Sequence, residues 1–193
     1  MKVLIVGSGG REHALSWKIS KSPLVKEIFV APGNGGTELE NSIINIDIQA
    51  DDIEGLAQFA INEKIDLTII GPENPLVNGI TDKFEESGLR CFGPSKGAAQ
   101  LEGSKEFMKD FLKKYNIPTA EYSAFTDPIK AIDYVREKGC PIVIKADGLA
   151  AGKGVTIANN IDEAKEAIDK ALESGIFGEA GRKIVIEEFL YGE

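Results

Sequence analysis

The sequence predicts an α/β protein whose first hundred residues form a Rossmann-like, doubly wound parallel sheet. Three observations support this fold class: short runs that are apolar throughout, amphipathic stretches between them, and glycine-rich turns directly after several runs. The apolar runs of the first half are 2–6, 27–31, 66–70 and 89–93. Because these runs do not alternate between apolar and polar residues, they indicate strands buried on both faces, as in a parallel sheet.

Amphipathic stretches between these strands predict helices over residues 13–20, 53–64 and 80–87. In the second of them Leu56, Phe59 and Ala60 share one helical face. Ligands bind at the carboxyl ends of the strands in such sheets, so the turns that follow strands are expected to gather at one edge. The turns are GSGGRE (7–12), PGNGGT (32–37) and GPENP (71–75).

The pattern changes near residue 95. A short helix, a break at Gly103 and a second helix over about 104–115 are predicted there. The apolar stripe of this second helix is interpreted as core packing; its members are Phe107, Met108, Phe111, Leu112 and Tyr115. The elements predicted after it are strand 121–125, helix 128–139, strand 140–146, strand 154–158, helix 162–174 and strand 182–190. A chain that stops so soon after an apolar strand is expected to be a fragment of a longer protein.

Composition limits the partners of this chain. Its 193 residues are 42% hydrophobic and 27% charged, as in ordinary globular proteins, and its net charge is −9. An acidic chain lacks the basic footprint that nucleic acid or an acidic membrane requires, whereas local cations can still hold an anionic small molecule. No run approaches the roughly 20 apolar residues of a membrane span. A cytoplasmic protein with neither nucleic acid nor membrane as partner is expected, and one histidine with two distant cysteines argues against a zinc site.

The turn GSGGRE resembles a dinucleotide fingerprint but departs from it. Gly7 and Gly9 fit G-x-G-x-x-G, while Glu12 occupies the third position, where a side chain hinders close helix–strand packing. A standard nicotinamide site is therefore not expected. A glycine turn that opens a helix still suits one phosphate, and Arg11 adds a bidentate donor. The alternative is a simple strand-to-helix turn with a solvated Arg11, and the other two turns, taken alone, are more often structural.

The stretch KADGLAAGKGV (145–155) is not a Walker loop. Only three residues separate Gly148 from Gly152, and Gly154 follows Lys153 where a serine or threonine would hold magnesium. The stretch lies between two apolar runs, so we interpret it as a glycine-rich hairpin flap. Its alternative is a mobile hairpin with a solvated lysine.

Two further lysines lie where an isolated cation is unfavourable. Lys145 ends a buried run, and Lys105 begins a helix at its positive end. One polyphosphate bound by both, with Lys153 on the flap, would explain these positions together, although an ion pair of Lys145 with Asp147 is the competing explanation. In the last strand Glu187 and Glu188 should point to opposite faces, which predicts one carboxylate near the lysines. The alternative is a solvated strand end.

Several of these segments together carry a family resemblance. Lys105, the stretch 145–155 and IVIEEFL (184–190) resemble the ATP-grasp fold. Five more segments extend the similarity over the whole chain to the phosphoribosylamine–glycine ligase family: GSGGREHAL (7–15), VAPGNGGT (30–37), DLTIIGPENPLVNG (66–79), FGPSKGAAQLEGSK (92–105) and IPTAEY (117–122). The resemblance implies an N-terminal domain over 1–102 that binds phosphoribosylamine, and the first, incomplete part of an ATP-grasp domain over 103–193.

The resemblance also implies the chemistry, which is ATP-dependent ligation of glycine to 5-phosphoribosylamine through a glycyl phosphate. The residues implied for ATP are Lys105, Lys145, the flap residues Gly148, Gly152, Lys153 and Gly154, the adenine-lining Glu187, Glu188 and Leu190, and, for the ribose, Glu193 or the residue after it. Those implied for phosphoribosylamine are Gly9, Gly10, Arg11, Asn34 and Glu73. Family members are more than twice as long. The magnesium ligands and the glycine site are therefore expected beyond residue 193, and no catalytic residue or metal ligand is assigned here.

Three alternatives remain at this stage. Another ATP-grasp ligase of purine or carboxylation metabolism is disfavoured by the GSGGREH turn. A nicotinamide- or sugar-nucleotide-binding oxidoreductase is opposed by Glu12. A non-catalytic binding module is the third.

Overall fold

The chain folds into two compact units, Met1–Ala99 and Gln100–Glu193, each with its own hydrophobic core. The computed structural model describes residues 1–150 and 152–192. Both units contain helices and strands, but the sheet of the first unit is parallel and that of the second is antiparallel.

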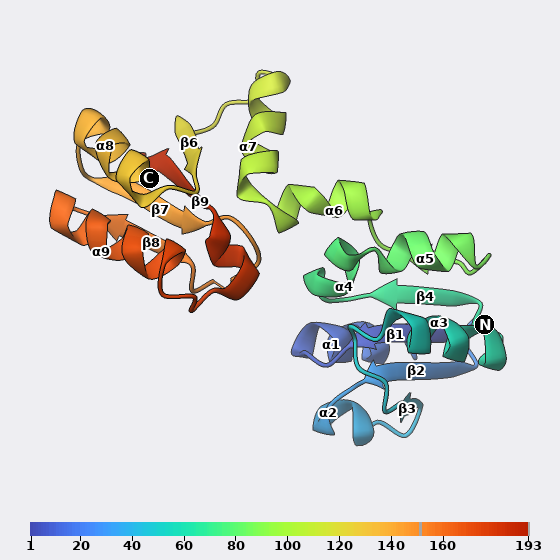
Figure 1. Ribbon diagram of the computed structural model, residues 1–193. Helices are drawn as coiled ribbons and strands as arrows, with labels where there is room; N and C mark the ends of the chain where they lie inside the picture. The colour runs from blue at the N-terminus through green and yellow to red at the C-terminus, as the bar shows by residue number, and fades with distance from the viewer. Residues whose placement is uncertain (151, 193) are drawn as a thin grey trace. The chain divides into compact units, whose positions relative to one another are not determined.

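The first unit contains a five-stranded parallel sheet (Figure 1). Its strands are β1 (Lys2–Gly7), β2 (Glu27–Pro32), β3 (Ile43–Asn45), β4 (Leu67–Ile70) and β5 (Cys91–Phe92). The strand order is β3-β2-β1-β4-β5, and each neighbouring pair is parallel. The order reverses between β1 and β4, which is the switch point at which doubly wound sheets bind their ligands.

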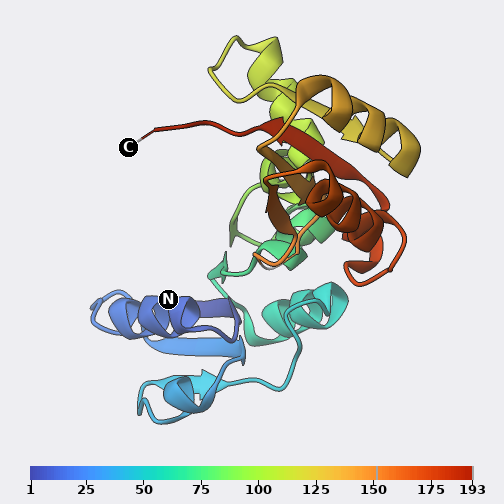
Figure 2. The ribbon, with the colours of Figure 1, turned by 90° about the vertical axis from the view of Figure 1, so that its left-hand side faces the viewer.

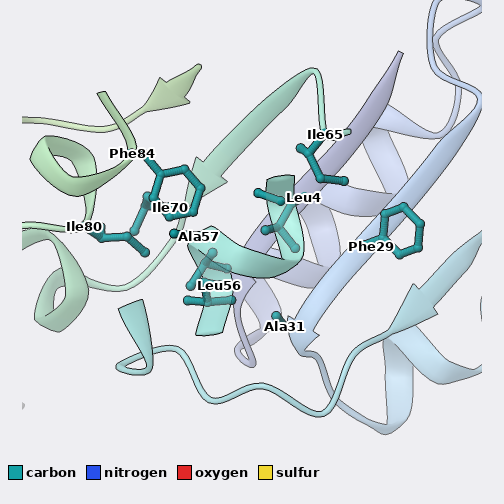
Figure 3. Packing of buried hydrophobic residues seen from close by; sticks show 11 residues of the cluster. Leu4, Phe29, Ala31, Leu56, Ala57, Ile65, Ile70, Ile80 and Phe84 are labelled. Atoms are coloured by element: carbon teal, nitrogen blue, oxygen red, sulfur yellow. The ribbon is translucent and has the colours of Figure 1, made fainter. Parts of the chain in front are cut away.

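Helices cover both faces of this sheet, as the uninterrupted apolar runs predicted. They are α1 (Gly10–Ile19), α2 (Gly35–Glu38), α3 (Ile53–Glu63), α4 (Glu73–Asn78) and α5 (Ile80–Glu86). Residues from α3 and α5 pack on the face that carries Leu4 of β1 (Figure 3). Ile19 of α1 packs with Ile5 on the other face. Leu56 of α3 is fully buried, and Phe59 contacts Phe29 edge-on at 5.4 Å between ring centroids. The shared helical face predicted from the sequence is confirmed.

Three short elements of the first unit were not predicted: α2, β3 and α4. They contain four, three and six residues, which is too few for a periodic pattern to show. The turns PGNGGT and GPENP therefore open short helices. Asn34 caps α2 by accepting hydrogen bonds from the Gly36 and Thr37 N–H groups.

The second unit is built on a four-stranded antiparallel sheet of order β6-β9-β7-β8. The strands are β6 (Tyr122–Phe125), β7 (Ile142–Ala146), β8 (Val155–Ala158) and β9 (Ile184–Glu188). The helices from the end of the first unit onward are α6 (Lys96–Gly103), α7 (Lys105–Lys114), α8 (Pro128–Lys138), α9 (Ile161–Leu172) and the 3₁₀ turn η1 (Gly178–Arg182). The predicted break at Gly103 is confirmed, since α6 ends there.

Helices α8 and α9 lie side by side on one face of the second sheet (Figure 1). Ile144 of β7 and Ile186 of β9 are partners in the sheet and belong to the core under these helices. Successive side chains of a strand point to opposite faces, so Lys145 and Glu187 lie on the other face. We refer to this second face, with Lys145 and Glu187, as the lysine face.

The interpretation of the α7 stripe as core packing is wrong for its three aromatic residues, whereas Met108 and Leu112 are half-buried. Phe107, Phe111 and Tyr115 are 44%, 36% and 55% exposed, and the buried residue of α7 is Lys109, at 2%. Lys109 of α7 faces the sheet and contacts Glu187, whereas the three aromatic residues face solvent. Its hydrophobic periodicity was real, but periodicity shows which residues share a face and leaves open which face is buried.

Replacement of Phe84, which is fully buried in α5, should destabilise the first unit. We expect Phe84→Ala to lower the free energy of unfolding by about 3–5 kcal/mol, because it removes apolar contacts and leaves a cavity. The matched control is Phe92→Ala, at a ring that is 70% exposed, with an expected change of about 0.5 kcal/mol or less. Trp17, the single tryptophan, lies in this unit, so urea unfolding followed by its fluorescence compares the two variants. Equal effects of both substitutions would contradict the packing described here.

Candidate functional site

The three glycine-rich turns of the first unit meet at the carboxyl edge of its sheet, as the sequence predicted. The Gly33 N–H donates to the Gly7 carbonyl (3.2 Å), and the Gly71 N–H donates to the Val6 carbonyl (3.0 Å). The side-chain amide of Asn34 donates to the Ser8 carbonyl (2.8 Å). These contacts bring the ends of β1, β2 and β4 together at the switch point of the sheet.

Glu12 is buried at the start of α1, where a dinucleotide fingerprint would have its third glycine. The side chain is 4% exposed, and its Oε2 accepts a hydrogen bond from the Gly9 N–H (2.7 Å). Two glycines make room for it: a Cβ on Gly7 would lie 2.5 Å from Glu12 Cγ, and one on Gly71 would lie 2.1 Å from Oε1. The carboxylate thus occupies the helix start that a dinucleotide pyrophosphate would need. This geometry supplies the physical reason for the sequence-based argument against a nicotinamide site.

Arg11 links the first and third turns. Its Nε donates to Glu12 Oε1 (2.9 Å), and its Nη1 donates to Glu73 Oε1 (3.1 Å). The guanidinium holds the pKa of the Glu73 carboxyl below its usual value, and the two carboxylates raise the pKa of Arg11. The Arg11 side chain is 55% exposed, so it remains accessible to an anion.

The remaining predicted residues of this edge differ in what they still offer a ligand. A Cβ on Gly10 would meet no atom within 4 Å, so the backbone of the first helical turn is open at Gly10. Its N–H has no acceptor within the helix, as at every helix start. The amide of Asn34 is already occupied, since Oδ1 accepts from two N–H groups and Nδ2 donates to the Ser8 and Gly9 carbonyls. A ligand contact by Asn34 would have to replace one of these bonds.

In the second unit, Asp147 organises the start of α7. Its Oδ1 accepts from the Glu106 N–H (2.7 Å), and its Oδ2 accepts from the Ser104 hydroxyl (3.1 Å). Ser104 Oγ in turn accepts from the Phe107 N–H (3.1 Å), so two groups cap one helix. The proposed ion pair of Asp147 with Lys145 does not form; the carboxylate satisfies the helix start instead.

Lys105 and Lys145 lie close together, as expected of two ligands of one polyphosphate. The Lys105 ammonium donates to the Gly148 carbonyl (3.1 Å) and lies 3.4 Å from the Asp147 carbonyl. Burial lowers the pKa of Lys105; the Asp147 carboxylate opposes this shift, and the nearby charge of Lys145 adds to it. An anion bound here would relieve both unfavourable effects.

Glu187 is the buried carboxylate of the lysine face, and it lies between two lysines. Lys145 Nζ is 2.9 Å from Oε1, and Lys109 Nζ is 3.0 Å from Oε2. Glu187 is 5% exposed, whereas Glu188 is exposed and its N–H donates to the Glu121 carbonyl (2.8 Å). The prediction that the two acids point to opposite faces, with one near the lysines, is confirmed.

Strands β7 and β8 pair antiparallel as a hairpin, as predicted, and the glycine-rich stretch lies between them in sequence. Gly148 lies so close to η1 that a Cβ would be 2.8 Å from Ala180 Cα, and a Cβ on Gly154 would be 2.7 Å from Ala150 Cβ. Gly152 has φ +76°, a conformation that favours glycine. Lys153 is exposed and lines a surface pocket of about 420 Å³ with Lys170 and Phe177. In this conformation the structure does not bring Lys153 to the other two lysines.

The segment after β9 leaves the sheet and runs on in extended form (Figure 2). Leu190 in this segment is 61% exposed. Glu193, implied for the ribose, lies outside the described residues. Among the described residues, the main chain after Glu188 makes no strand pairing with the second sheet.

Two residues of these sites were not predicted: Lys109, and Glu12 as a structural carboxylate. Lys109 is one helical turn after Lys105, and residues four apart share a helix face. This spacing was the available signal. Nothing in the sequence indicated that two glycines leave room for Glu12, because Gly7 and Gly71 are far apart along the chain.

Neither a metal centre nor a membrane span is found in the part of the chain that the structure describes. No group of three or more His, Cys, Asp or Glu side chains there is placed to hold a metal ion. The described helices are too short or too polar to cross a bilayer.

These features define the class of protein. A Rossmann-type unit followed by a helix-covered antiparallel sheet, with paired lysines and a glycine-rich hairpin, is the N-terminal architecture of ATP-grasp proteins. Residues 1–102 match the family described as Phosphoribosylglycinamide synthetase, N domain, and residues 103–193 match its ATP-grasp (A) domain. The chain belongs to the phosphoribosylglycinamide synthetase family.

Individual relatives agree with this family. The chain is 61% identical to the phosphoribosylamine–glycine ligase of Escherichia coli (strain K12), over 100% of the chain and 45% of that protein. The crystal structure of the Thermotoga maritima phosphoribosylamine–glycine ligase matches with a TM-score of 0.79 and 32% identity, over 100% of the chain and 45% of the other. A biotin carboxylase domain from Hydrogenobacter thermophilus, solved with MgADP, shares the fold at TM-score 0.79 and 19% identity, over 98% and 44%. The chain thus spans less than half the length of these relatives.

Substitution at Gly71 should test the packing of Glu12. We expect Gly71→Ala to destabilise the first unit by about 1–3 kcal/mol, because the new methyl group displaces a buried, hydrogen-bonded carboxylate. Gly97→Ala is the matched control, since a Cβ there meets no atom within 4 Å, and at this helical position it should leave stability unchanged or raise it by up to about 1 kcal/mol. Urea unfolding followed by Trp17 fluorescence measures both variants. A Gly71→Ala protein as stable as the control would show that Glu12 is not held in place.

The Arg11–Glu73 pair should be visible in a titration. We expect the Glu73 carboxyl, followed by NMR, to titrate below an ordinary glutamate and to move up toward the ordinary value in Arg11→Gln. Since its folded-state pKa is lowered, any stabilisation by the pair is present above the unfolded-state pKa and is lost as pH falls through the folded-state pKa. Lys18→Gln, which removes an exposed charge from the same helix, is the control and should leave the titration unchanged. A Glu73 midpoint that does not respond to Arg11→Gln would contradict the pair.

Proposed function

We propose that this chain supplies the N-terminal domain and the first part of the ATP-grasp domain of a phosphoribosylamine–glycine ligase. The reaction is ATP + glycine + 5-phosphoribosylamine → ADP + phosphate + glycinamide ribonucleotide. The observation that carries the proposal is the grouping of Lys105 and Lys145 beside a glycine-rich hairpin, in a chain similar over its whole length to such ligases. The proposed division is 1–102 for phosphoribosylamine and 103–193 for ATP.

In the second unit, Lys105 and Lys145 would hold the α- and β-phosphates of ATP. Lys105 donates to neutral carbonyl groups of the hairpin, so a bound anion would give it charge-assisted partners instead, while Lys145, now paired with Glu187, would turn its charge toward the same anion. The hairpin would close over the triphosphate through Gly148, Gly152 and Gly154, with Lys153 joining the other lysines only after the loop has moved.

The adenine would lie along the segment that leaves the sheet after β9. Glu187, Glu188 and Leu190 would line this slot, partly through main-chain atoms, and Glu193 or the residue after it would bind the ribose. Extended backbone without sheet partners offers the donor and acceptor pair that reads an adenine edge. The exposure of Leu190 is in keeping with an apolar contact that a base would cover.

In the first unit, phosphoribosylamine would bind at the carboxyl edge of the sheet. The N–H groups at the start of α1, open at Gly10, together with Arg11, would meet its phosphate. The N–H of Gly9 is already bonded to Glu12, so Gly9 would contribute the shape of the turn. Glu73 and Asn34 would lie on the sugar side, where the ionised Glu73 accepts hydrogen bonds from hydroxyl groups.

The chemistry of the ligase requires an acyl phosphate. ATP would phosphorylate the glycine carboxylate, and the amine of phosphoribosylamine would then displace phosphate from it. In this step the described residues bind and orient the ATP phosphates and the phosphoribosyl group. They do not fit a magnesium ion by themselves, so the Mg²⁺ ligands are assigned to the part of the longer protein beyond this chain.

The proposal is tested by omitting substrates in turn. ADP release by the complete ligase that contains this chain should depend on both glycine and phosphoribosylamine, because the amine acts only on glycyl phosphate. The 193-residue chain alone should release no ADP above background, since the glycine and magnesium sites are assigned elsewhere. ADP release by the complete protein that ignores either substrate would refute the assignment. Robust glycine-dependent ADP release by the 193-residue chain would refute the assignment of the glycine and magnesium sites to the rest of the longer protein.

A further inference from the structure

Lys109 of α7 is buried against the lysine face, where it contacts Glu187, and the proposed function does not use it. Its side chain is 3% exposed. The ammonium donates to Thr119 Oγ1 (2.7 Å) and to the Ala120 carbonyl (3.2 Å), and it lies 5.7 Å from the centre of the Tyr122 ring. A lysine so enclosed cannot contact a ligand that binds from solvent. Its role must therefore be exerted through its neighbours.

The neighbour that carries charge is Glu187. Lys109 lies at Oε2 and Lys145 at Oε1, at 3.0 and 2.9 Å. Oε1 is a buried oxygen that accepts no aligned hydrogen bond from the described residues, although Lys145 Nζ lies 2.9 Å from it. Lys145 and Glu187 therefore interact as two nearby charges and not through an aligned hydrogen bond. Lys145 keeps 25% of its side chain exposed and can turn to another anion.

The charges of Lys109, Lys145 and Glu187 suggest what Lys109 does. One carboxylate between two ammonium groups leaves one positive charge in excess, and only Lys145 can present it to solvent. Without Lys109, the single charge of Glu187 would be matched by Lys145 alone, and the pair would be neutral toward an incoming anion. Charges that are partly withdrawn from water interact strongly, so this difference should be large.

We propose that Lys109 is a positioning residue of the polyphosphate site, which neutralises Glu187 from its buried side and so keeps the charge of Lys145 available for the anion. The identity of that anion, the triphosphate of ATP, rests on the proposed function. A merely structural role, in which Lys109 only fastens α7 to the sheet, makes a different prediction, because it does not depend on the charge of Glu187.

Four variants of the 193-residue chain separate the two roles. Lys109→Met removes the buried charge, Glu187→Gln removes its partner, and the double variant removes both. The control is Lys113→Met, at an exposed lysine of the same helix, which removes the same charge from the surface. The probe is inorganic tripolyphosphate, because it has no base to contact Glu187. Binding is followed by NMR at low salt, where weak complexes are visible, and thermal unfolding shows whether each variant is folded.

The expected order of affinity is Glu187→Gln, then wild type and the double variant together, then Lys109→Met. Lys109→Met should bind tripolyphosphate roughly tenfold more weakly than wild type, and Glu187→Gln more tightly, since each changes the free charge of the site by one. The double variant should return to within about threefold of wild type, and the exposed Lys113→Met should stay within the same range because solvent screens it.

Rescue by the double variant is the decisive result, and it remains measurable if Lys109→Met alone does not fold. Affinity that stays low in the folded double variant, or that is unchanged in Lys109→Met, overturns the inference while the proposed function stands. A wild-type chain that binds no tripolyphosphate overturns both the inference and the ATP site. A complete ligase whose ADP release ignores glycine overturns the proposed function alone.

Discussion

The arrangement of the second unit depends on two carboxylates that hold cations and helix ends in place. Glu187 lies between Lys109 and Lys145, and Asp147 caps α7. The first contact fixes α7 against the lysine face, and the second places Lys105 at the start of that helix beside the hairpin. Removal of a buried charge partner leaves the other charge uncompensated, which is far more costly than loss of a surface ion pair. These contacts therefore determine where the lysines lie.

Lys105 and Lys145 show that a lysine at an unfavourable position in a sequence indicates a binding site but does not prove one. Lys105 and Lys145 are unfavourably placed for isolated cations, yet each has an internal partner: carbonyl groups for Lys105 and Glu187 for Lys145. These internal partners allow both lysines to be partly buried without a ligand. What points to an anion is that Lys105 remains partly desolvated beside a second cation, with its pKa lowered, next to a glycine-rich turn.

In the first unit, Glu12 is the residue that distinguishes this sheet from a dinucleotide-binding sheet. Its strand order and glycine turns are those of a dinucleotide-binding sheet, but Glu12 occupies the helix start and binds the Gly9 N–H. The carboxylate is accommodated because Gly7 and Gly71 have no side chains. Arg11 contacts both Glu12 and Glu73, and its guanidinium remains accessible from solvent at this edge of the sheet.

The sequence by itself determined the parallel sheet, the hairpin of β7 and β8, the break at Gly103 and the opposite orientation of Glu187 and Glu188. Each follows from a local pattern, namely apolar runs, glycine spacing or strand alternation. Only the tertiary structure decided that α7 buries Lys109 and exposes Phe107, that Asp147 caps a helix, and that Lys153 lies apart from the other lysines. These outcomes depend on partners more than thirty residues away or on the path of a loop. No local pattern encodes such long-range contacts, since they exist only once the chain has packed.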